Sequence, residues 1–64
     1  MKTTLRIVPR PELSEPFEVE VVDWLVRDGC LIAVQEKNDL RVRTYMPLEN
    51  LVKFEHVLPY AGGV

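Results

Sequence analysis

Short runs of β-branched and aromatic residues, rather than a helical period, dominate the hydrophobic pattern of this chain. Residues 3–8 form one such run, and it ends at Pro9, which lacks a backbone donor. From Phe17 onward apolar and charged residues alternate as in a half-buried strand, but the apolar positions change phase after Val22. A strand that continues through such a change contains a β-bulge or a sharp bend, and bent strands allow small barrels to close. We therefore expect one long, bent strand in this region.

Two dipeptides predict hairpin turns. Asp28-Gly29 separates two β-rich runs, and a type I′ turn needs positive φ at both central residues, which Asp and Gly tolerate. A two-residue loop at this point sets Arg27 opposite Cys30 and thereby fixes the register of both strands. Asn38-Asp39 is the expected tip of a second hairpin, whose returning strand covers residues 40–45.

The remaining segments predict connections and a closing strand. Residues 9–16, rich in Pro and Glu, are expected to form an extended loop. Residues 47–50 begin with proline and suit one helical turn, residues 51–57 suit a last strand, and residues 61–64 suit a flexible tail. The sequence thus predicts a single, mainly β domain over residues 1–64, a small antiparallel barrel of five strands with one short helical turn before the last.

The predicted register gives the central strands two apolar faces. The first face carries core candidates, which are Val22, Trp24, Val26, Leu31, Ala33, Leu40 and Val42. The second face carries Leu25, Cys30, Ile32, Val34 and Tyr45, with Arg27, Arg41 and Arg43 among them. A solvated sheet face would be polar, so we expect the second face to be covered. Its cover is either the rest of the chain, curled into a barrel, or a second subunit or another protein.

Composition limits how so short a chain is stabilised. A chain of 64 residues buries only about 60% of the surface that it exposes when unfolded. Its single cysteine, Cys30, excludes an internal disulfide, and with the single His56 it cannot form a zinc cluster, which leaves self-association or a very good core. The net charge of −2 gives no global case for nucleic acid binding. Charge is uneven, however, because residues 12–23 carry acidic side chains and no basic one.

The pattern offers no catalytic or metal-binding motif. We find no nucleophile paired with a base, no Gly-rich phosphate loop and no metal-ligand spacing, and we expect neither enzymatic activity nor a cofactor or metal. His56 alternates onto the same side as Phe54, which favours a structural histidine. Trp24 is expected to anchor the core rather than an interface.

The candidate site is a partner-binding surface on the second face. Arg41, Arg43 and Tyr45 alternate onto one side of a strand, with Arg27 expected nearby. Planar guanidinium groups beside an aromatic ring suit carboxylates, phosphates or stacked bases, although the same residues also occur on ordinary barrel surfaces. The full predicted set is Arg27, Arg41, Arg43, Tyr45, Leu25, Ile32 and Val34.

The sequence also bears on location. No apolar run approaches the roughly 18 residues that a membrane span needs, and residues 1–10 lack the apolar region of a secretory signal. We therefore expect a cytoplasmic protein with no membrane partner. A free cysteine agrees with a reducing compartment.

The order of these elements resembles a known family. Over about residues 17–57 the chain is expected to form a strand, the Asp28-Gly29 turn, a strand, the Asn38-Asp39 turn, a strand, the Pro47-Leu48-Glu49-Asn50 turn and a last strand. This order resembles that of the five-stranded SH3-like and Sm-like small barrels. The glycine and asparagine pattern of an RNA-binding Sm motif is absent, so the resemblance implies the fold and not RNA binding. Residues 44–55 are also similar in style to the ends of many short phage-encoded proteins, which implies an accessory protein acting on a host protein in the host cytoplasm.

Three functional hypotheses follow. The leading one is a non-enzymatic protein-interaction module that self-associates and binds a protein partner through the second face and its rim. The alternative is an Sm-like or OB-like protein that binds single-stranded nucleic acid through Arg41, Arg43 and Tyr45, against which the acidic net charge argues. A third is an enzyme whose active site forms only at the symmetry axis of an oligomer.

Overall fold

The computed structural model describes residues 2–59, which form six β-strands and one short 3₁₀ turn. In chain order the elements are β1 (Thr3–Pro9), β2 (Phe17–Val21), β3 (Asp23–Arg27), β4 (Cys30–Lys37), β5 (Leu40–Pro47), η1 (Leu48–Asn50) and β6 (Leu51–Val57). The prediction of a mainly β chain is confirmed, and residues 51–57 form the last strand as expected.

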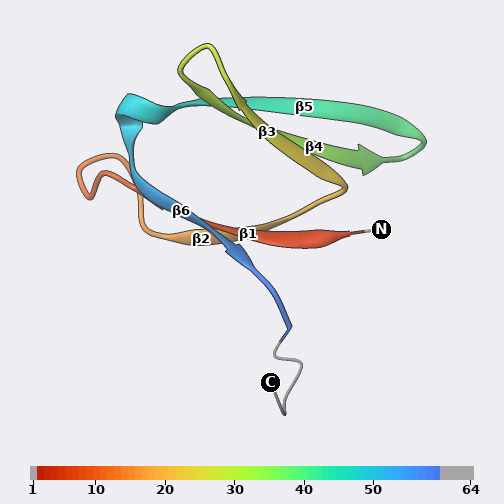
Figure 1. Cartoon of the computed structure of the whole chain (residues 1–64), viewed down its shortest axis with the longest axis horizontal. Coiled ribbons are helices and arrows are strands. Elements are labelled where there is room, and N and C mark those ends of the chain that lie inside the picture. The colour runs from red at the N-terminus through yellow and green to blue at the C-terminus, as the bar shows by residue number, and fades with distance from the viewer. Residues whose placement is uncertain (1, 60–64) are drawn as a thin grey trace.

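The strands form two antiparallel sheets that lie face to face (Figure 1). Sheet A has the order β2-β1-β6, and sheet B has the order β3-β4-β5. The structure thus differs from the predicted five-stranded barrel, because it has six strands and the described residues form two separate sheets instead of one closed sheet.

The extra strand arises at Val22. Its backbone N–H donates to the carbonyl oxygen of Val34 at 2.8 Å, while the residues before it pair with β1 and those after it pair with β4. The chain therefore leaves sheet A and enters sheet B at this residue, which divides the predicted long strand into β2 and β3. The change of phase in the sequence coincides with this crossing.

The turn positions of both predicted hairpins are confirmed, and so is the register predicted for the first. Asp28 and Gly29 have φ of 51° and 74°, and Arg27 lies opposite Cys30. In the second hairpin Asn38 and Asp39 have φ of 50° and 64° between β4 and β5. Positive φ at both central residues is the signature of the type I′ turn, whose twist matches that of the flanking strands.

The other connections agree with the prediction in part. The helical turn is present as η1, and the Leu48 N–H donates to the carbonyl oxygen of Gly29 at 2.9 Å. The segment 9–16 is not extended throughout, because the N–H groups of Leu13 and Ser14 both donate to the Arg10 carbonyl oxygen at 2.9 and 3.3 Å. The predicted tail at residues 61–64 lies outside the described residues.

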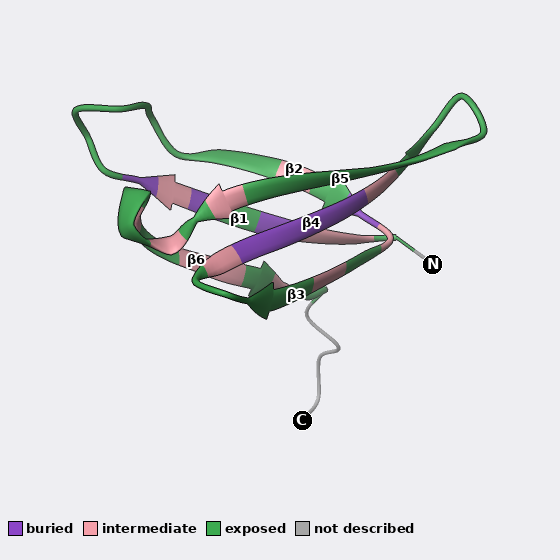
Figure 2. Ribbon diagram, turned by 90° about the horizontal axis from the view of Figure 1, so that it is seen from above, coloured by how far each residue is buried: buried purple, intermediate pink, exposed green. Residues whose placement is uncertain are grey.

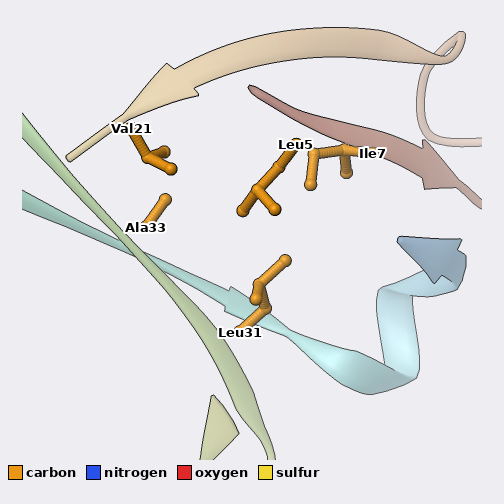
Figure 3. Packing of buried hydrophobic residues seen from close by; sticks show 5 residues of the cluster. All are labelled: Leu5, Ile7, Val21, Leu31 and Ala33. Atoms are coloured by element: carbon orange, nitrogen blue, oxygen red, sulfur yellow. The ribbon is translucent and has the colours of Figure 1, made fainter. Parts of the chain in front are cut away.

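The core lies between the two sheets. Leu5, Ile7 and Val21 of sheet A point toward Leu31 and Ala33 of β4 (Figure 3). Half-buried apolar side chains from β2 and four further elements surround this cluster, namely Val19, Trp24, Met46, Leu48, Leu51 and Phe54. Removing such side chains from water is the main stabilising contribution available to a chain of this size.

Three predicted core residues are exposed, so that part of the prediction is wrong. Val26, Leu40 and Val42 are 49%, 66% and 36% exposed. They lie toward the turn ends of their hairpins, and the tip of the β4–β5 hairpin extends beyond sheet A (Figure 2). Alternation put these residues on the inner face, but sheet A does not reach Leu40 and Val42 at the β4–β5 tip. Val26 lies on the edge strand β3 and is exposed although its neighbour Leu31 is buried.

Candidate functional site

The outer face of sheet B brings the predicted partner-binding residues together. Ile32 in the central strand β4 lies opposite Leu25 of β3 on one side and Tyr45 of β5 on the other. The next row along the same face consists of Val34 with Asp23 and Arg43 as its two partners, since every second residue of a strand points to the same side.

These rows line a concavity of about 300 Å³. Its lining residues come from all three strands and the first turn: Asp23, Leu25, Arg27, Asp28, Cys30, Ile32, Val34, Arg41, Arg43 and Tyr45. All of the predicted partner-binding residues are among them, and so is Cys30, which the predicted register places on this face. Asp23 could have been found from the same alternation, because it shares the phase of Leu25. Asp28 lies in the turn, where no periodic signal applies.

The concavity has an apolar floor. Ile32 and Val34 are only 6% and 5% exposed, although they point away from the core between the sheets. Side chains of β3 and β5 flank them, and two of these, Leu25 and Tyr45, are themselves exposed. Because the floor is already nearly inaccessible to water, the apolar area that a bound partner can cover is mainly that of Leu25 and Tyr45.

The rim of the concavity carries three arginines. Its lining also contains two aspartates, and Glu36 beside Arg41 adds a third carboxylate, so the charges balance in number. Arg27 Nε lies 3.8 Å from Asp28 Oδ2, and Arg41 Nη2 lies 3.5 Å from Glu36 Oε2. Within residues 2–59, Arg43 has no carboxylate within 4.0 Å, so its guanidinium donors are available to a ligand.

The outer face of sheet A has the opposite character. Arg6 at its centre contacts Glu18 at 3.0 Å and Glu55 at 3.6 Å, and Lys53 lies 3.8 Å from the same Glu55. These exposed groups compensate one another's charge and keep the face hydrated, as expected for the solvated side of an antiparallel sheet. The apolar floor is therefore a property of sheet B and not of both outer faces.

Tyr45 separates the concavity from a second, smaller hollow. That hollow has a volume of about 190 Å³ and includes Leu13 and Phe17 near the start of β2 as well as Pro47 at the end of β5. Leu13 is 56% and Tyr45 57% exposed. The apolar surface thus continues from sheet B past Tyr45 toward the loop before β2.

Trp24 and His56, whose roles the sequence left to be decided, each contact other side chains. Trp24 packs edge to face on Phe54 and on His56, with ring centroids 5.8 and 5.7 Å apart. The Nε2 atom of His56 also lies 2.7 Å from the Thr3 hydroxyl oxygen. The expectation that Trp24 packs against the core is confirmed.

Residues 2–59 contain no group of three or more His, Cys, Asp or Glu side chains placed to hold a metal ion. Over the same residues, no helix is long and apolar enough to cross a membrane. Comparison with protein-family models, with curated proteins and with solved structures finds no match to this chain.

Proposed function

We propose that this chain is a non-enzymatic protein-interaction module that binds an acidic, partly apolar peptide segment of a partner protein in the sheet B concavity. The observation that carries this proposal is the exposed pair Leu25 and Tyr45 on either side of Ile32, on an outer sheet face with arginines at its rim. An apolar side chain of the partner would cover Leu25 and Tyr45, and its carboxylates would meet the arginines.

Arginine suits this role better than lysine would. Its planar guanidinium can bind a carboxylate through two parallel hydrogen bonds and is only weakly hydrated, so it loses little on partial burial. Arg43 is the natural first contact for a partner carboxylate because it lies beside Val34 at the floor and has no intramolecular ion pair among the described residues.

We also propose that the two sheets are a variant of the SH3-like and Sm-like small barrels. In support, β2 and β3 follow one another through Val22 and act as one bent strand shared by both sheets. The 3₁₀ turn η1 then carries the chain from β5 in sheet B to β6 in sheet A. Comparing an experimentally determined structure of this chain with structures of SH3-like and Sm-like barrels would test that relationship.

A peptide selection tests the proposed binding. A random peptide library is selected on the wild-type protein and counter-selected on a Leu25→Ser, Arg43→Gln variant. We expect acidic peptides with one or two apolar residues to be enriched, and their titration to shift the amide resonances of β3, β4 and β5. Enrichment of peptides that shift only the resonances of sheet A would contradict it.

The second candidate function is binding of single-stranded nucleic acid. It is favoured by the alignment of exposed Arg41, Arg43 and Tyr45 on one strand, since bases stack on aromatic rings and phosphates bind arginine. Phosphate binding weakens steeply with added salt because counterions are released. Fluorescence anisotropy with a labelled oligonucleotide at low and high salt measures this, and no binding at low salt would remove the candidate.

A further inference from the structure

Two strands of opposite charge have one open edge each. β5 is the last strand of sheet B, and β2 is the first strand of sheet A. The outward side chains of β5 include Arg41 and Arg43, and those of β2 are Glu18 and Glu20, with the same spacing of two residues. An open strand edge offers unpaired backbone donors and acceptors to another chain, and proteins usually cover or disrupt it.

The two open edges lie on the same side of the molecule. Figure 1 places β5 and β2 in different layers, and Figure 2, turned by 90°, places both toward the side opposite β3 and β6. A second copy turned about an axis parallel to the strands would therefore set its β2 against β5 of the first copy. The same rotation sets its β5 against the first copy's β2, so both edges are paired at once, and antiparallel.

The backbone of β5 has the right groups at this edge. Residues that flank a two-residue turn exchange both ladder hydrogen bonds, so Leu40 bonds to Lys37 and the bonding alternates from there. The N–H and C=O groups of Arg41, Arg43 and Tyr45 therefore point away from β4, toward the open edge.

The backbone of β2 is arranged in the same way. The Gln35 Nε2 donates to the carbonyl oxygen of Glu20 at 3.0 Å, which indicates that this carbonyl points away from β1, and Gln35 has to release it when a second chain pairs there. Alternation then directs the N–H and C=O groups of Glu18 to that side as well. The residues whose backbone groups face outward are thus the same residues that carry the charges, on both strands.

We propose that this chain forms a two-fold symmetric dimer in which β5 of each copy pairs with β2 of the other. Arg43 then lies opposite Glu18 and Arg41 opposite Glu20, on one continuous outer face. On the inner face the same register sets Val42 opposite Val19 and brings exposed Leu40 next to Val21. The dimer thereby covers apolar side chains that the single chain leaves in water.

Charge disfavours the two simpler pairings, although Glu18 also contacts Arg6 and Arg41 also contacts Glu36 within the chain. An antiparallel β5–β5 contact would set arginine against arginine, and a β2–β2 contact would set glutamate against glutamate. Like charges directly opposite each other destabilise a strand pair, whereas opposite charges stabilise it. The β5–β2 contact leaves the floor of the sheet B concavity uncovered but occupies Arg41 and Arg43 at its rim, so the dimer competes with the proposed peptide for these two side chains.

A charge-reversal experiment tests the dimer by light scattering over a concentration series. The wild type is expected to approach twice the chain mass of 7.4 kDa, whereas the R41E/R43E and E18R/E20R variants are each expected to remain monomeric. Mixed in equal amounts, the two variants should form a mixed dimer, because every pair then has opposite charges again.

Three results would overturn the proposal: a wild type that is monomeric at every concentration, an E18R/E20R variant that still dimerises, or a mixture that stays monomeric. Trp24 fluorescence checks that each variant is folded. If the charge reversal in E18R/E20R unfolds β2, the neutral E18Q/E20Q variant is used in its place. It is expected to weaken the dimer by about tenfold. E18R/E20R changes no lining residue of the concavity, so its peptide affinity reports separately on the proposed function.

Discussion

Trp24 of β3 and Phe54 of β6 meet edge to face, with ring centroids 5.8 Å apart and ring planes at 73°. The contact joins sheet B to sheet A on the side opposite the open edges of β5 and β2. Each strand is at the outer limit of its own sheet, so this aromatic pair takes the place of a backbone ladder between them.

A double-mutant cycle measures this contact. Trp24→Leu and Phe54→Leu are each expected to lower the free energy of unfolding, because each removes packing between the sheets. The interaction energy between the two positions is expected to be about 0.5–1.5 kcal/mol. Urea unfolding of the two single variants and the double variant gives this value, and a coupling near zero would mean that the rings do not hold the sheets together.

The largest loss of stability is expected for a substitution in the core cluster. Leu31 is fully buried between the sheets, so Leu31→Ala is expected to lower the free energy of unfolding by about 2–5 kcal/mol. Val52→Ala is the matched control, since Val52 is 62% exposed, and its effect is expected to stay within about 0.5 kcal/mol. Similar midpoints of urea unfolding for the two variants would show that the core lies elsewhere.

Substitutions in the two hairpin turns are expected to change stability in opposite directions. Gly29 has φ of +74° and open space around the position of a Cβ, so Gly29→Ala introduces backbone strain without a steric clash. The expected loss is about 1–2 kcal/mol. Asp39→Gly relieves a positive φ of 64° and is expected to stabilise the second hairpin. Thermal unfolding compares the two variants, and an unchanged midpoint for Gly29→Ala would contradict the turn geometry.

The ion pairs on sheet A are expected to contribute little. Arg6 contacts both Glu18 and Glu55, but these side chains are about half exposed. Arg6→Ala is therefore expected to lower stability by about 1 kcal/mol or less, with a smaller effect at high salt. Urea unfolding at two salt concentrations checks this, and a loss comparable to that of Leu31→Ala would mean that the charged face is part of the stable core.

The sequence predicts the local features well because their causes are local. The Asp28-Gly29 and Asn38-Asp39 turns need positive φ, which few residue types tolerate, and a two-residue turn fixes the strand register beyond it. That register, together with alternation, was enough to place Leu25, Ile32 and Tyr45 side by side on one face.

The errors concern contacts between residues far apart in the chain. Alternation tells which way Leu40 and Val42 point, but not that sheet A ends before it can cover them. It indicates a bend near Val22, but not that the two halves of the strand join separate sheets. The prolines of residues 9–16 were interpreted only as breaking a ladder, although Pro11 stands at the second position of the turn closed on the Arg10 carbonyl, where proline is favoured.

The central claim concerns the outer face of sheet B, and two neighbouring residues of β3 test it most directly. Leu25 points into the concavity, whereas Val26 points to the other side of the same strand, and both are partly exposed. The measurement is the affinity of a selected acidic peptide for the Leu25→Ser and Val26→Ser variants, by fluorescence anisotropy. The account predicts that Leu25→Ser weakens binding by about tenfold or more while Val26→Ser leaves it nearly unchanged. Equal affinities for the two variants, or a loss confined to Val26→Ser, would contradict it.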